Sequence, residues 1–184
     1  MNRPLRADAA RNRARVLEVA YETFAAEGLA VPIDEIARRA GVGAGTVYRH
    51  FPAKEDLFRA VVDDRIRAII TWGQELLETV APGEALFTFL RTLVLKWGAA
   101  DRGLSEALAG AGVSVEMAIP EIEDEFLAML GELLRAAQDA GTVRPEIGVA
   151  EVKALLVGLQ AMQGYNSDAA NRVIDVVLDG LRAS

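Results

Sequence analysis

The chain has 184 residues, a formal net charge of −7 at pH 7 and no cysteine. This length suits one medium-sized domain, or a small domain joined to a larger one. The lack of cysteine excludes disulfide bonds, thiol redox chemistry and thiolate metal sites. A composition of 52% hydrophobic and 26% charged residues is typical of a globular protein rather than a disordered chain.

No apolar run reaches the roughly 18–20 residues that a membrane span requires. The N-terminus is polar and rich in arginine, with no apolar segment behind it, which is unlike a secretory signal. We therefore expect a cytoplasmic protein with no membrane partner.

The charges are distributed unevenly. Residues 1–50 hold eight Arg and six Asp or Glu, whereas residues 51–184 hold 12 Lys or Arg and 21 Asp or Glu. A basic end on an acidic body favours an interaction of that end with nucleic acid. A solvated arginine-rich tail without a partner would account for the same charges.

Hydrophobic periodicity predicts helices through the first third of the chain. The first helix covers about residues 8–27 and ends at Gly28, and the second opens at Pro32 and ends before Gly41. A short third helix spans about 44–50 and is closed by Pro52. A long fourth helix begins at Lys54 and continues to about residue 80.

The rest of the sequence continues this pattern. Further helices are predicted at about 84–100, 103–110, 120–140, 150–164 and 168–182, with Pro120 and the acidic residues after it marking a helix start. No alternating strand pattern, repeat or low-complexity tract is present. The fold class is therefore predicted to be all-α, with about nine helices.

The second and third predicted helices are joined by Ala40-Gly41-Val42-Gly43. Two short helices across a tight turn with glycine form the helix-turn-helix pattern, although ordinary helical corners show the same spacing. At roughly 100° per residue, Val47 and Phe51 share one face and can pack on the first helix. The hydroxyl, guanidinium and imidazole groups of Thr46, Arg49 and His50 then face away from it, which suits phosphates and base edges.

The resemblance to a known family rests on four segments. They are RVLEVAYETFAAEG (residues 15–28), IDEIARRAGV (33–42), GTVYRHF (45–51) and KEDLF (54–58). In this order they resemble the TetR family of bacterial transcriptional regulators. The resemblance covers about residues 11–60, whereas the remainder is similar only in length and helical character.

The resemblance implies a homodimer that binds double-stranded DNA at an inverted-repeat operator and responds to a small-molecule effector, most often as a repressor. The third helix would lie in the major groove. Tyr48, His50 and Lys54 would hold phosphates, while Thr46 and Arg49 would contact bases or nearby backbone. N-terminal arginines, among them Arg11 and Arg13, could reach a flanking groove.

The sequence departs from the family pattern at three positions. Gly43 stands where relatives often have a serine cap, and Pro32 where they often have threonine; we expect both to be tolerated, because glycine at an N-cap costs only a few tenths of a kcal/mol. Ala44 offers no hydrogen bond at a position where relatives can recognise a base, while Gly45 allows a close backbone approach. Base discrimination would then depend on Arg49, Thr46 and DNA shape.

The C-terminal part is expected to enclose the effector and form the dimer. The predicted division is a DNA-binding domain at 1–53 and a ligand-binding and dimerisation domain at 54–184. Pocket candidates, each of which could equally be a core residue, are Trp72, Phe87, Leu90, Trp97, Phe126, Met129, Gln163 and Tyr165. Dimer candidates, for which packing within one chain is the alternative, are Leu155, Leu159, Met162, Val173, Val177 and Leu181.

The sequence also bears on two other classes of function. An enzyme would need a nucleophile–base pair or a metal cluster, and the chain has one histidine and no cysteine. We expect no catalytic residue, metal or cofactor. A helical adaptor that binds only protein is the remaining alternative, and it would show no duplex binding even at low salt.

Overall fold

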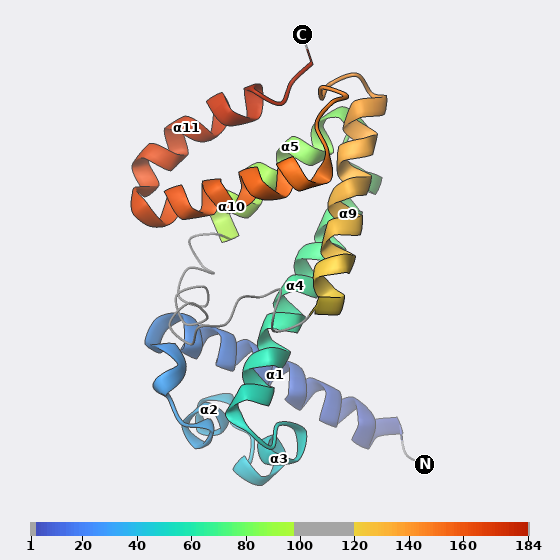
Figure 1. Cartoon of the computed structure of the whole chain (residues 1–184). Coiled ribbons are helices and arrows are strands. Elements are labelled where there is room, and N and C mark those ends of the chain that lie inside the picture. The colour runs from blue at the N-terminus through green and yellow to red at the C-terminus, as the bar shows by residue number, and fades with distance from the viewer. Residues whose placement is uncertain (1–2, 98–119, 184) are drawn as a thin grey trace. The chain divides into compact units, whose positions relative to one another are not determined.

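The computed structural model describes residues 3–97 and 120–183. Within these ranges the chain is helical, with α1 (Arg3–Glu27), α2 (Ile33–Ala40), α3 (Ala44–His50) and α4 (Lys54–Thr79) in the first half (Figure 1). The second half contains α5 (Pro82–Thr92), α9 (Pro120–Asp139), α10 (Val149–Tyr165) and α11 (Ser167–Asp179). A 3₁₀ turn, η1 (Gly28–Ala30), follows α1, and a π-helical turn, η2 (Leu93–Trp97), follows α5.

The all-α prediction is confirmed for the described residues, with three differences at element boundaries. Helix α1 begins at Arg3 rather than near residue 8, because Pro4 is tolerated in a first turn and the following residues are strong helix formers. The helix predicted at 84–100 is α-helical only to Thr92 and continues as η2. The helix predicted at 103–110 lies outside the described residues.

The third difference concerns the end of α11. This helix ends at Asp179, not near residue 182, because the chain after Gly180 pairs with the loop that follows α9. The N–H of Arg144 donates to the carbonyl of Leu181 at 3.1 Å, and the N–H of Ala183 donates to the carbonyl of Thr142 at 3.0 Å. This short antiparallel bridge fixes the end of α11 to its own unit.

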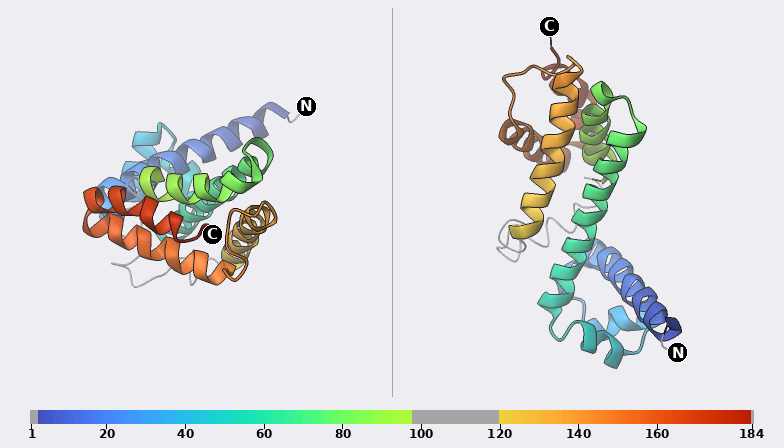
Figure 2. Two further views of the ribbon diagram at one scale, coloured as in Figure 1. Left: turned by 90° about the horizontal axis from the view of Figure 1, so that it is seen from above. Right: turned by 90° about the vertical axis from the view of Figure 1, so that its right-hand side faces the viewer.

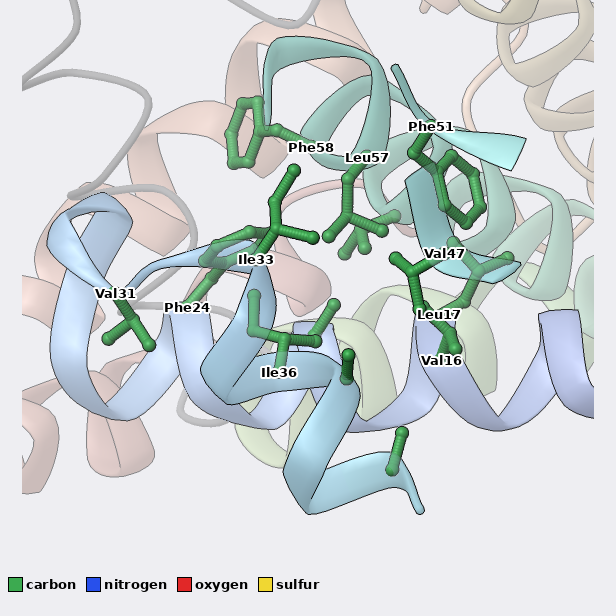
Figure 3. Close-up of a cluster of buried hydrophobic side chains, with 14 of the residues drawn as sticks. Val16, Leu17, Phe24, Val31, Ile33, Ile36, Val47, Phe51, Leu57 and Phe58 are labelled. Carbon is green, nitrogen blue, oxygen red and sulfur yellow. The ribbon is translucent and has the colours of Figure 1, made fainter. Parts of the chain in front are cut away.

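The described chain divides into two compact units within α4, between Ile66 and Arg67. The first unit is built around a single hydrophobic core (Figure 3). In it, Phe24 of α1 meets Phe58 of α4 edge to face, with ring centroids 5.7 Å apart. The other large buried members are Val16, Leu17, Val31, Ile33, Ile36, Val47, Phe51, Leu57, Val61 and Val62.

The start of α4 therefore packs with α1 to α3. The sequence-based division at 53/54 falls at the first residue of this helix, whereas Leu57, Phe58 and Val61 belong to the core of the first unit. Phe58 of α4 contacts Phe24 of α1, so the apolar side chains of the first turns of α4 are buried in this core.

The second unit consists of the remainder of α4 with α5, η2, α9, α10 and α11. Helix α9 lies alongside this part of α4 in both views of Figure 2, and they are so close that a Cβ added at Gly73 would stand 2.3 Å from the Sδ of Met129. Helices α10 and α11 lie side by side (Figure 1). Arg91 of α5 pairs with Asp175 of α11, and the guanidinium of Arg182 lies 4.1 Å from the ring centroid of Phe87.

Candidate nucleic-acid interface

The turn between α2 and α3 depends on Gly41. This residue has φ +67° and ψ 28°, a left-handed conformation that side chains with a Cβ rarely adopt. Its N–H donates to the carbonyls of Ala37 and Arg38, and the N–H of Val42 donates to that of Ala37 at 3.0 Å. These bonds satisfy the last carbonyls of α2 and turn the chain sharply into α3.

Helix α3 is held by its buried side. Val47 is 1% exposed and Phe51, just past the helix, is 4% exposed, and both belong to the core with α1 and α4. The N–H groups of Thr46 and Val47 donate to the carbonyl of Gly43 at the start of the helix. No side chain caps this start by a hydrogen bond.

The opposite side of α3 is open. Tyr48 is 43% exposed, and Gly45, Arg49 and His50 are exposed as well, whereas Ala44 and Thr46 are half-buried. No heavy atom lies within 4 Å of a Cβ added at Gly45, so the backbone there faces open space. Tyr48, Arg49 and His50 therefore present hydrogen-bonding groups on one short exposed surface, which we name the α3 face (residues 45 and 48–50).

Arg13 of α1 extends this face. Its guanidinium carbon lies 5.7 Å from the ring centroid of Phe51, and the His50 ring lies beside the same phenyl ring at 6.1 Å. Arg11, in contrast, pairs with Asp8 on its own helix. Of these two predicted arginines, the structure brings only Arg13 into contact with the segment that carries α3.

Lys54 is half-buried at the first position of α4. The carboxylate of Asp56 accepts from the N–H of Ala53 at 3.1 Å and thereby caps the start of this helix. Lys54 thus lies three residues after Phe51, at a fixed helix end that follows α3 directly.

An ion-pair network fixes α2 to the end of α1. The guanidinium of Arg39 contacts both Glu27 of α1 and Glu35 of α2, and Arg38 forms two bonds of 2.7 Å with Glu35. Hydrogen bonds from Arg38 and then Arg39 lower the pKa of the Glu35 carboxyl to about 2. The bond from Arg39 likewise lowers the pKa of Glu27. Two arginines of α2 are thus engaged within the protein.

The predicted pocket residues all belong to the second unit but have different surroundings. Phe87, Leu90, Phe126, Met129 and Gln163 are buried, and Trp72 is half-buried. Tyr165 is 92% exposed, so the described residues of this chain do not enclose it. Trp97 lies in η2. Helices α4, α5 and α9 bring Trp72, Phe89 and Phe126 into one row.

The predicted dimer residues are also divided. Leu159 and Leu181 are buried within the chain, at 2% and 4% exposed. Val173 is 36% exposed, and Leu155, Met162 and Val177 are half-buried. The strongly exposed Val157 and Val176, at 51% and 70%, were not predicted, because periodicity alone does not distinguish two apolar sides of one helix.

Among the described residues, no group of three or more His, Asp or Glu side chains is arranged to hold a metal ion. In the same part of the chain, no helix combines the length and apolar character needed to span a membrane.

A tight left-handed turn, a short helix held by one buried side and an open polar surface define the helix-turn-helix class of DNA-binding proteins. The family model described as bacterial regulatory proteins, tetR family, matches residues 16–61. The model described as transcriptional regulator SbtR-like, C-terminal domain, matches residues 81–183. The chain belongs to the TetR family, a family of transcriptional regulators.

Solved structures support this membership over nearly all of the chain. A TetR transcription regulatory protein from Mycobacterium vanbaalenii is 60% identical, with a TM-score of 0.82, and the match covers 98% of this chain and 100% of that one. A TetR transcriptional regulator from Streptomyces coelicolor is 31% identical, with a TM-score of 0.76 and coverage of 94% and 99%.

Curated relatives match a shorter part. An HTH-type transcriptional regulator of Staphylococcus aureus is 40% identical over 73 residues, which is 39% of this chain and 40% of that protein. The chain thus matches well under half of the length of this relative.

Proposed function

We propose that the protein is a ligand-responsive, sequence-specific transcriptional regulator, a repressor that leaves an inverted-repeat operator when a small molecule binds. The single observation that carries this proposal is the α3 face beside Arg13, in a chain of the TetR family. Such a regulator acts on bacterial DNA in the cytoplasm.

In this proposal α3 enters the major groove. Tyr48, His50 and Lys54 hold phosphates on either side of it, and Arg49 with Thr46 contacts bases or nearby backbone. Gly45 lets the backbone approach, and Ala44 contributes no hydrogen bond. Arg13 adds a phosphate contact from α1, whereas Arg11 contributes less because Asp8 already neutralises it.

The dimer would form through the exposed side of α10 and α11. This apolar strip consists of Val157, Gly158, Val173 and Val176, flanked by the half-buried Leu155, Met162 and Val177. A Cβ added at Gly158 meets nothing within 4 Å, so another helix can approach closely there. Leu159 and Leu181 would support the strip from beneath, and two-fold symmetry would pair it with its own copy.

Effector binding would shift the population between dimers that fit the operator and dimers that do not, through different affinities for the two states. The two α3 helices must lie about one DNA turn apart, roughly 34–36 Å or a multiple of it, to engage both half-sites. The effector would bind in the second unit, near the row of Trp72, Phe89 and Phe126.

The test is selection of bound duplexes from a randomised pool, followed by salt titration of the enriched sequences. We expect an inverted repeat whose affinity falls steeply with salt. The triple variant Tyr48→Ala, His50→Ala, Lys54→Ala should lose this binding, whereas Arg135→Ala, an exposed cation of α9, should retain it. Circular dichroism checks the fold of both. Absence of enrichment at low salt would favour the protein-binding adaptor instead.

A further inference from the structure

Three aromatic rings from three helices form a row inside the second unit. Trp72 of α4 stacks on Phe89 of α5, with ring centroids 5.3 Å apart and planes inclined by 24°. Phe89 in turn lies 6.4 Å from Phe126 of α9. Phe89 and Phe126 are buried, at 0% and 7% exposed, so their positions are set by close packing.

A charged pair closes the Phe126 end of this row. The Nζ of Lys153, on α10, lies 2.6 Å from the Oε1 of Glu123, on α9. The same ammonium lies 5.1 Å from the ring centroid of Phe126. The two charged side chains are only 23% and 17% exposed, so the pair is largely shielded from solvent.

A shielded ion pair of this kind is expected to contribute little to the stability of the folded protein. Removing two charges from water costs about as much as their attraction returns, and apolar replacements of buried pairs are often neutral or stabilising. A half-enclosed carboxylate next to an aromatic face is, in contrast, the arrangement that binds ammonium groups. Lys153 currently provides that ammonium group.

The partners differ in how easily they can leave. Phe126 is fixed by the aromatic row, and Glu123 lies one helical turn before it on the same helix. Lys153 carries its charge at the end of a four-carbon flexible stem, which can turn towards water at small cost. A ligand cation would therefore displace Lys153 and keep the other two groups in place.

We propose that Glu123 and the face of Phe126 form an ammonium subsite of the effector site, that Lys153 fills it in the free protein, and that the effector is an organic cation. This inference rests on the proposed ligand-responsive function. The acidic character of residues 51–184, with 21 Asp or Glu against 12 Lys or Arg, favours the approach of cations over anions.

The experiment compares three probes that share one phenyl ring and differ in charge, on the full-length protein by calorimetry. They are benzyltrimethylammonium, the neutral benzyl alcohol and the anionic benzoate. We expect the cation to bind most tightly. Lys153→Met removes the resident ammonium but keeps the stem, and it should tighten cation binding about tenfold, whereas Glu123→Gln should weaken it by about the same factor.

The ion pair between Arg67 of α4 and Glu125 of α9 provides the matched control. It joins α4 to α9 at 3.0 Å, but both side chains are about half exposed, at 52% and 49%. Arg67→Gln and Glu125→Gln should leave cation binding unchanged. Thermal melting of each variant checks that the fold is retained.

Three outcomes would overturn the inference. They are preferential binding of benzoate that is lost in Lys153→Met, equal cation affinity in Glu123→Gln and the unmodified protein, and no cation binding even in Lys153→Met. Duplex binding is measured on the same samples without probe. If the protein binds the cation but no duplex, the result counts against the proposed regulator only. If it binds the duplex but not the cation, the result counts against this inference only.

Discussion

The guanidinium of Arg13, on α1, lies over the ring of Phe51, the residue that closes α3. The buried phenyl ring thereby holds a cation from one helix at the end of another. Arg13 becomes part of the same surface as His50, which lies beside the same ring. The α3 face thus gains a positive charge that comes from α1 rather than from α3.

Replacing Arg13 should weaken DNA binding without loss of fold. Arg13→Gln is expected to lower duplex affinity several-fold for all sequences and to reduce the salt-dependence slope by about 1, because one phosphate contact is lost. Arg11→Gln is the matched control, with a smaller expected effect because Asp8 already pairs with Arg11. Equal slopes for both variants in fluorescence anisotropy titrations would contradict this role of Arg13.

Two glycines of the helix-turn-helix should respond to alanine in opposite directions. Gly41→Ala should reduce the free energy of unfolding by about 1–2 kcal/mol, because φ +67° is strained for a residue with a Cβ. Gly45→Ala should raise it by about 0.5–1 kcal/mol, because Gly45 lies within α3 and its Cβ would meet no atom within 4 Å.

Gly45→Ala separates stability from function. Its added methyl group lies on the α3 face, so we expect weaker duplex binding by a more stable protein. Urea unfolding and duplex titration of the same preparations test this pair of effects. Unchanged duplex affinity would show that the backbone at Gly45 does not approach DNA.

The ion pairs of Glu35 should make stability depend on acid pH. Hydrogen bonds from Arg38 and Arg39 lower the pKa of this carboxyl from 4.5 to about 2 in the folded protein. Its contribution is therefore fully present above about pH 4.5 and is lost as the pH falls towards 2. The network is exposed to solvent, so the effect should be modest and reduced by salt.

Two measurements test the role of Glu35. A carboxyl NMR titration should place its midpoint near pH 2, and a midpoint near 4.5 would contradict the network. In urea unfolding, Glu35→Gln should lose stability less steeply than the unmodified protein between pH 4.5 and 2.

The apolar strip of α10 and α11 should control dimer formation. Val176 is 70% exposed, so Val176→Lys should leave the fold of the chain unchanged while placing like charges across the proposed two-fold interface. We expect a shift towards monomer in sedimentation velocity and much weaker binding to a full inverted repeat. Ala128→Lys, on the exposed side of α9, is the control and should remain dimeric. A dimeric Val176→Lys variant would place the interface elsewhere.

The sequence by itself determined most of the helix-turn-helix. The short α3 was predicted at its observed bounds of 44–50, because Gly41 and Pro52 act locally on the backbone and need no tertiary partner. The same holds for Pro120 at the start of α9. The burial of Val47 and Phe51 followed from helical periodicity alone.

Only the tertiary structure decided which side chains meet. Arg11 pairs with Asp8 three residues away on its own helix, a contact that the sequence spacing allows, whereas only the packing of α1 places Arg13 over the distant Phe51. Periodicity marked Leu159 as an interface candidate and gave no sign of Val176, because a helix with apolar residues on two sides does not indicate which side its own chain covers. Local sequence sets where helices begin and end, whereas contacts between distant residues depend on how those helices pack.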